Sequence, residues 1–476
     1  MCTLLVGKGG YAVRRGRKLA LKREEGTVGV GGYRQELNRA LGFKHLLAYG
    51  MVFMVPIAPV ATYGFVVGPA SGMVPLVYLI GIAAMFFTAF SYRWMSQEFP
   101  TAGSVYSYVQ RDLNAHVGFL AGWMIMAGYL LAPALLYGFT GTWLNALVPQ
   151  VPIWVFIVTF VVINTFVTGR GITVTARTNF VLLALELVAL AAFIAVAIKY
   201  VFIDGGGTGG LSLDPLYQPG NVDLGFLGAA TSIAVLSFLG FDGISTLAEE
   251  TERPERTVGN ATVAALLILG VIFVVQTYLA ALVQPNFEGL DPAGAFFDIA
   301  RTAGGPFLYY LLLIVSIIAA GIANALAAQL AISRIIYSVS RDGMLPASRF
   351  LSRVHQRYRT PFNATVFVGV VTLSVALIFD LVTVAKFVSF GALTAFMALN
   401  VSVIAYFFIR RGRRSGRDFV FYLIFPLLGF LIIFYVWFNF DAGTFLFGLL
   451  WLAAGIIIGA VKTKGFREKP TIVQGL

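Results

Sequence analysis

The stretch Ser237-Phe238-Leu239-Gly240-Phe241-Asp242-Gly243 decides the fold of this chain, because it places two glycines and a carboxylate inside an apolar run. Another apolar run is interrupted at Val55-Pro56-Ile57-Ala58-Pro59. Glycine and proline both favour departures from helical geometry, so each run predicts a broken helix. Two broken helices at corresponding positions of two five-helix halves are typical of the substrate site of a secondary transporter.

The composition predicts an all-α integral membrane protein. Of the 476 residues, 58% are hydrophobic and 12% are charged, whereas soluble domains average about 25% charged residues. A membrane-spanning helix needs roughly 20 apolar residues. Twelve such helices are predicted, at residues 46–68, 74–98, 117–147, 152–169, 176–202, 224–247, 258–283, 306–338, 362–380, 383–409, 419–439 and 442–461.

The basic residues predict the orientation of these helices. If the N-terminus is cytoplasmic and the spans alternate, only Lys199, Arg301 and Lys386 of the 34 Lys and Arg residues fall on the outer side. Cytoplasmic loops of membrane proteins carry such an excess. We therefore expect a multi-pass protein of the inner (plasma) membrane with both termini cytoplasmic. Residues 1–44 are expected to form a basic cytoplasmic tail, and residues 464–476 a second one.

Several functional classes lack support. The net charge of +12 comes from residues that flank apolar spans, so no nucleic acid partner is expected. A single cysteine and three dispersed histidines predict no disulfide framework and no metal site. The Gly-rich stretch at residues 205–210 lacks the Lys-Ser/Thr of a phosphate-binding loop. The chain is thus expected to have no cofactor and no ATP site, and not to be an enzyme.

Asp242 is the leading candidate for binding a substrate. Carboxylates inside membrane spans are costly and usually face a cavity or a partner, although a purely structural hydrogen bond is the alternative. Gly240 lets the backbone leave the helix, and the preceding half-helix points its negative end at the break. Phe238 and Phe241 can wall such a pocket and offer ring faces to an ammonium group, but ordinary apolar packing explains them too.

The break in the first span supplies the facing wall. Pro56 and Pro59 cannot donate helix hydrogen bonds, so carbonyls are freed around Ile57 and Ala58. The half-helix after Pro59 presents its positive end to the break. A simple proline kink is the alternative interpretation. Tyr129 in the third span is a further candidate for the pocket, with bundle packing as its alternative.

Glu186 is the second carboxylate inside a predicted span. Its neighbours at helical spacing are apolar, which disfavours the charged form and makes it a candidate for proton coupling. It could equally bind a second amine of the substrate. Asn324 and Gln329, in the eighth span, are polar exceptions in a stretch of small residues and are candidates for the permeation path.

These residues resemble the amino acid–polyamine–organocation superfamily, and within it most closely the bacterial putrescine importers. The motifs that carry the resemblance are Phe99-Pro100-Thr101-Ala102-Gly103-Ser104, Ser237 to Asp242 followed by Glu249-Glu250-Thr251, and Arg341-Asp342-Gly343-Met344-Leu345-Pro346. The resemblance implies a five-plus-five inverted repeat working by alternating access. Its halves would be residues 45–203 (helices 1–5) and 204–409 (helices 6–10), followed by two peripheral helices at 410–463.

The chain departs from amino acid members of that superfamily at two points. They typically place a glycine motif in the first break, where this chain has Pro56-Ile57-Ala58-Pro59, and many have a lysine where Glu186 stands. Two carboxylates in one pocket suit a dication. We therefore expect import of putrescine or another polyamine by proton symport or by exchange (antiport). An amino acid permease is the alternative, and a membrane receptor or enzyme has no supporting motif. Coupling ion and oligomeric state stay open.

Overall fold

The computed structural model describes residues 41–100, 104–171, 176–220, 223–341, 343–358 and 360–467. The predicted N-terminal tail lies almost wholly outside these ranges, as does most of the C-terminal tail. The described residues form helices and no strand, apart from an isolated bridge between Leu41 and Thr251. The helices belong to one compact unit, Arg39–Leu476.

In chain order the first half contains α1 (Phe43–Met54), α2 (Ala58–Val67), α3 (Val74–Glu98), α4 (Ser104–Asp112), α5 (Ala115–Leu147), α6 (Ile153–Gly169), α7 (Ala176–Ile198) and η1 (Lys199–Ile203). The second half contains α8 (Leu224–Ala234), η2 (Val235–Phe238), η3 (Phe241–Glu250), α9 (Pro254–Val283), α10 (Ala295–Ile318), η4 (Ala319–Asn324), α11 (Ala325–Arg341), α12 (Ser348–Leu351), α13 (Phe362–Ile378), α14 (Leu381–Val403) and η5 (Ile404–Arg410). The last elements are α15 (Gly416–Phe419), η6 (Val420–Ile424), α16 (Phe425–Phe438) and α17 (Ala442–Lys462).

Within the described ranges, ten helical runs are long and apolar enough to cross a membrane, and α6 and α13 are shorter apolar helices of 17 residues each. Most boundaries lie within a few residues of the predicted spans, and α3 has the predicted bounds. A left-handed Gly305 followed by Pro306 breaks α10, so its first part stands apart from the span that continues through η4 into α11. No helix was predicted for that first part or for α4.

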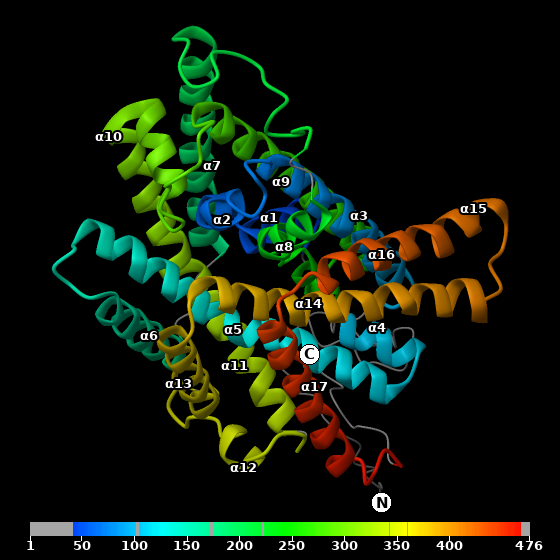
Figure 1. Ribbon diagram of the computed structural model, residues 1–476. Helices are drawn as coiled ribbons and strands as arrows, with labels where there is room; N and C mark the ends of the chain where they lie inside the picture. Colours follow the sequence, from blue (N-terminus) through cyan, green and yellow to red (C-terminus); the bar gives the residue numbers. More distant parts are fainter. Residues whose placement is uncertain are drawn as a thin grey trace, which may run out of the picture. The chain divides into compact units, whose positions relative to one another are not determined.

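The helices fall into two groups around the broken elements (Figure 1). α3 and α1 pack against α9, and α2 packs against α8. In the other group, α5 packs against α6, α11 and α13. α14 packs against α3 of the first group and α5 of the second, and α16 and α17 pack against α14. The two breaks, Val55–Ile57 and Leu239–Gly240, face α5 of the second group, because residues of both breaks and of α5 line one cavity.

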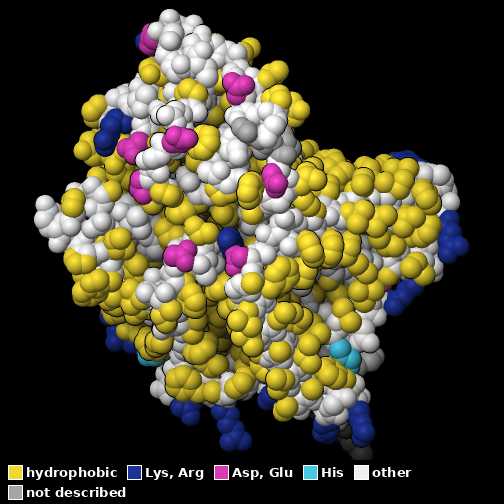
Figure 2. Space-filling view, in the orientation of Figure 1, with side chains coloured by type: hydrophobic (Ala, Val, Ile, Leu, Met, Phe, Trp, Pro, Cys, Tyr) yellow, Lys and Arg dark blue, Asp and Glu magenta, His cyan; other side chains and the backbone are white. Residues whose placement is uncertain are grey.

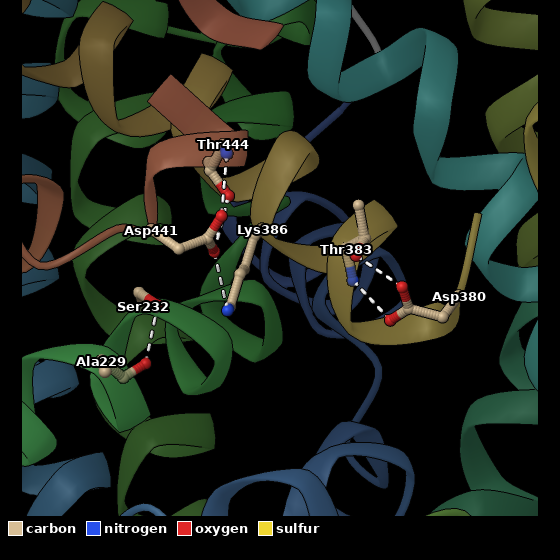
Figure 3. A network of polar contacts seen from close by, with 7 residues as sticks. All are labelled: Ala229, Ser232, Asp380, Thr383, Lys386, Asp441 and Thr444. Atoms are coloured by element: carbon tan, nitrogen blue, oxygen red, sulfur yellow. Dashed lines mark hydrogen bonds and ion pairs between the residues drawn. The ribbon is translucent and has the colours of Figure 1, made fainter. Parts of the chain in front are cut away.

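Several of the long helices have a side-chain cap at their N-terminus. The first N–H groups of a helix have no partner within it, and the capping side chain accepts from one of them. Asp380 accepts from the Thr383 N–H at the start of α14, and Asp441 does so from Thr444 at the start of α17 (Figure 3). Lys386 of α14 also pairs with Asp441 at 2.8 Å. Partial burial acts to raise the pKa of Asp441, but these hydrogen bonds outweigh it and hold the pKa at about 2.

Candidate functional site

The break in the first span is a strained turn between two half-helices. α1 ends at Val55, whose φ of 60° lies in the left-handed region that a β-branched residue rarely adopts. The Ala58 N–H donates to the Val55 carbonyl and the Val60 N–H to the Ile57 carbonyl, both at 2.9 Å. α2 begins there with Pro59 in its first turn, where a missing N–H does no harm. Such strain often marks functional sites.

Gly240 makes the break in the sixth span possible. Leu239 is extended, and Gly240 follows with a φ of 117° between the 3-10 helices η2 and η3. A Cβ atom at Gly240 would lie 2.6 Å from the Phe53 ring and 2.9 Å from the Phe53 carbonyl oxygen. The two breaks therefore touch, and only glycine permits that approach. Gly243, also expected to leave helical geometry, lies inside η3 and has no left-handed φ.

Asp242 lies at the start of η3 and is only 3% exposed. The Tyr129 hydroxyl donates to its Oδ2 atom at 3.1 Å, and the Gly240 N–H donates to its Oδ1 atom at 3.2 Å. A carboxylate has about four lone-pair sites, so these two bonds leave acceptor capacity free. The arrangement suits a bound cation.

A cavity of about 190 Å³ opens at the two breaks. Among the residues predicted for the site, Ile57, Ala58, Tyr129, Gly240 and Asp242 line it. Asn324 of η4 lines it as well, whereas Gln329 instead joins α11 to α5 and α6 through Tyr137 and Thr165. Asp242 is the one charged side chain of the lining, which the described residues otherwise make from apolar and neutral polar groups.

Four residues predicted for the site do not line the cavity: Phe238, Phe241, Pro56 and Pro59. They pack behind the residues that do. Phe238 packs against Tyr78 and Phe273, with ring centroids 5.8 and 5.3 Å apart. Phe241 packs against Tyr92 and Phe396. Pro56 and Pro59 are likewise buried in the break without facing the cavity. Phe53, which the sequence did not single out, lines the cavity next to Tyr129, and Phe139, Trp143 and Phe396 line it as well.

Glu186 is not brought to the cavity. It lies on α7, is 4% exposed, and its Oε2 atom has no hydrogen-bond partner. α7 packs against α10, α9 and α1 rather than forming part of the lining. The pocket with two carboxylates, expected from the sequence, is therefore not formed in this structure. The cause is the packing of α7 as a whole: none of its residues lines the cavity, and no local pattern in the sequence reveals such packing.

Thr62, Ser237 and Ser316 add neutral hydroxyl groups to the lining, and Tyr78 bonds to two of them from outside it. Thr62 of α2, Tyr78 of α3 and Ser237 of η2 form a triangle with oxygen–oxygen distances of 2.7, 3.0 and 3.3 Å. The triangle therefore links α2, which follows the first break, to η2, which precedes the second. Ser316 also lines the cavity, and its buried Oγ atom has no hydrogen-bond partner. Ser316 and Thr62 were missed because isolated hydroxyl residues in apolar spans carry no distinctive sequence signal.

The adjoining π-helix η4 gives the cavity part of its shape. The π-helical hydrogen-bond pattern leaves the buried Gly321 carbonyl able to accept from outside the helix, and the Asn164 side chain donates to it at 2.9 Å. Asn324, at the end of η4, lines the cavity. Nowhere in the described ranges do three or more His, Cys, Asp or Glu side chains gather as a metal site.

Known proteins that are similar to this chain are permeases and transporters. A family model described as amino acid permease matches residues 45–467. The low-affinity putrescine importer PlaP of Escherichia coli strain K12 is 35% identical over 437 residues, which is 91% of this chain and 96% of that protein. The branched-chain amino acid permease BcaP of Bacillus subtilis is 26% identical, covering 80% of this chain and 83% of its own. The methylthioribose transporter of Bacillus subtilis is 25% identical, covering 87% and 90%.

Proposed function

Because the chain belongs to the amino acid permease family and is a secondary transporter, we propose that it imports a small cationic amine, with putrescine or another polyamine as the leading substrate. The observation that carries this proposal is the position of Asp242. Its carboxylate faces the cavity between the two helix breaks, and two donors leave part of it free for an ammonium group. Phe53 and Tyr129 line the same cavity, so their rings are available to a bound ammonium group.

The rest of the cavity suits an alkyl chain. Leu135, Leu136 and Val388 offer apolar surface to the methylene groups of an amine. Glu186 does not reach this space, so a second ammonium group would meet neutral oxygens. Ser316 Oγ is such an acceptor, because it is buried there without a partner. Hydrogen bonds from an ammonium group to a neutral hydroxyl are weaker than those to a carboxylate.

An amino acid is the second candidate substrate, and the similarity to branched-chain amino acid permeases favours it. Its carboxylate would need N–H donors at the helix 1 break. Pro56 and Pro59 have none, those of Ala58 and Val60 already donate to backbone carbonyls, and among residues 56–60 the Ile57 N–H is the one left to meet a carboxylate. The local backbone therefore favours a substrate without a carboxylate.

The proposal includes the membrane arrangement expected from the sequence. Twelve spans would form an inverted repeat of helices 1–5 (45–203) and 6–10 (204–409), with helices 11 and 12 (410–463) peripheral and both termini cytoplasmic. Figure 2 supports one orientation: Lys and Arg gather at the lower and right edges of the molecule, whereas Asp and Glu lie mostly over its upper half. Alternating access would then move the two helix groups around the breaks.

Coupling to protons, or exchange of one amine for another, would drive the import. Glu186 supports proton coupling, because a carboxyl group that is buried without a hydrogen-bond partner can exchange a proton as its surroundings change. Its place on α7, beside α1 of the broken span, would link that proton to movement of the site rather than to direct contact with the substrate.

Uptake into proteoliposomes tests the function directly. Purified protein should accumulate labelled putrescine, and unlabelled diamines should compete better than amino acids of similar length. An imposed inward proton gradient should speed net uptake, whereas preloaded putrescine should speed exchange. Uptake of a branched-chain amino acid without uptake of putrescine would replace the amine proposal with its alternative.

A further inference from the structure

The carbonyl of Pro56 loses its helical partner at the break. In an uninterrupted helix it would accept from the N–H of Val60, four residues later. Here the Val60 N–H donates instead to the Ile57 carbonyl, at 2.9 Å. A buried backbone carbonyl without a donor destabilises the fold, so another part of the chain has to supply one.

Gln276 of α9 supplies it. Its side-chain Nε2 atom donates to the Pro56 carbonyl oxygen at 3.1 Å, across 220 residues of sequence. The Gln276 side chain is 0% exposed, and its Oε1 atom has no hydrogen-bond partner. Rotating the amide by half a turn would set Oε1 against the Pro56 oxygen, two acceptors face to face. The contact with Pro56 therefore fixes the side chain, although its own oxygen stays unpaired.

The same part of α9 supports both breaks. One turn before Gln276, the Phe273 ring packs against Phe238 of η2 and Tyr78 of α3, with centroids 5.3 and 5.9 Å apart. The contact of Phe273 with the sixth span is apolar and tolerates small shifts. The contact of Gln276 with the first span is a single directional hydrogen bond, so it specifies where the unwound turn lies.

We propose that Gln276 is a positioning residue for the substrate site. By holding the Pro56 carbonyl, its amide keeps Ile57 and Ala58 in the cavity wall and keeps Phe53 against Gly240. It contacts no cavity itself, and it acts through the backbone of helix 1. The inference rests on the proposed function, because it concerns the geometry of the same site.

Gln276→Met is the direct test, because methionine fills a similar volume without a donor. Thr277→Val is the matched control: Thr277 is equally buried on the next position, and its hydroxyl donates to the Phe273 carbonyl of its own helix. We expect Gln276→Met to raise the KM for putrescine about two- to tenfold, the effect of one net hydrogen bond. Its Vmax per folded molecule should change little, and Thr277→Val should leave KM at the parent value.

The outcomes separate this inference from the function itself. If the parent takes up no amine, the proposed function fails. If the parent takes up putrescine and Gln276→Met has the parent KM, Gln276 does not position the site. A Vmax loss at unchanged KM, shared by Thr277→Val, would show a merely structural role. Should Gln276→Met fail to fold, Gln276→Asn withdraws the amide by one methylene group, and the same rise in KM is expected of it.

Discussion

Inside a membrane protein, a polar side chain depends on partners that its own chain provides. Asp242 receives two of them, the Tyr129 hydroxyl and the Gly240 N–H, and keeps free acceptor capacity toward the cavity. Glu186 receives no partner at Oε2 and lies away from the cavity. The two carboxylates inside the spans thus differ in their surroundings: Asp242 has acceptor capacity free for a cation, and Glu186 is placed to hold a proton.

Glu186→Gln tests the second role. The glutamine keeps the shape of the side chain and cannot ionise, so the pH dependence of net putrescine uptake should become flatter while exchange at equal pH persists. The measurement is the initial rate in proteoliposomes between about pH 5.5 and pH 8. Parent-like pH dependence in Glu186→Gln would assign the residue a structural role only.

Asp112 makes a separate pH prediction outside the spans. Its side chain is fully buried at the end of α4, where Arg410 contacts one carboxylate oxygen at 3.3 Å and the other has no partner. Burial raises the pKa of Asp112 to about 6, although Arg410 opposes the shift. The folded protein therefore holds this proton more tightly than the unfolded chain does, and the corresponding stability is lost as pH rises through about 6.

The unfolding temperature in detergent checks this sign. Between about pH 4 and pH 7 the parent should lose stability with rising pH, and Asp112→Asn should lose less because its amide does not ionise. An identical pH slope in both proteins would mean that folding does not raise the pKa of Asp112.

Among the helices, the two breaks show what a sequence can predict. Both were placed correctly, because proline and glycine act locally and interrupt an apolar run visibly. The residues facing the cavity were predicted less well. Phe238 and Phe241 point away from it, and Phe53 points toward it. Which face of an almost wholly apolar helix lines a cavity depends on its rotation against neighbours, and an apolar helix carries little periodic signal to reveal that.

Gly240→Ala tests the break of the sixth span. The added Cβ atom would meet Phe53 at 2.6 Å, and a φ of 117° is strained for alanine. Strain of about 1–3 kcal/mol corresponds to a loss of roughly fivefold to over one-hundredfold in the population of the competent site. Uptake per folded molecule should fall accordingly.

Gly68→Ala is the control, because Gly68 has helical backbone angles and nothing lies within 4 Å of its added Cβ. Normal uptake by Gly240→Ala would show that the break does not need a left-handed residue.

For the whole molecule, the positions of most spans could be read from hydropathy, since length and apolar content are local properties. Helix packing could not. The two helix groups, and the exclusion of Glu186 from the cavity, follow from contacts between segments far apart in the sequence. α4 was missed as well, because it is short and carries polar residues that hydropathy does not register.

Chemical labelling tests the orientation. In a background with Cys2 replaced, Gly210→Cys in the loop after α7 should react with a membrane-impermeant reagent added to intact cells. Gly416→Cys, at the start of α15, should react only after permeabilisation. Nothing lies within 4 Å of an added Cβ at either position, so both are suitable labels. The reverse pattern would invert the proposed topology.

The central claim is that Asp242 binds the ammonium group of the substrate, and putrescine binding to Asp242→Asn tests it most directly. Asparagine keeps the shape and removes the charge, so losing a charge-assisted hydrogen bond of about 1.5–3 kcal/mol should weaken binding roughly ten- to over one-hundredfold. Asp223→Asn is the matched control, since Asp223 caps α8 of the same broken span through the Phe226 N–H. The account predicts weak binding by Asp242→Asn and parent-like binding by Asp223→Asn; parent-like affinity in Asp242→Asn would contradict it.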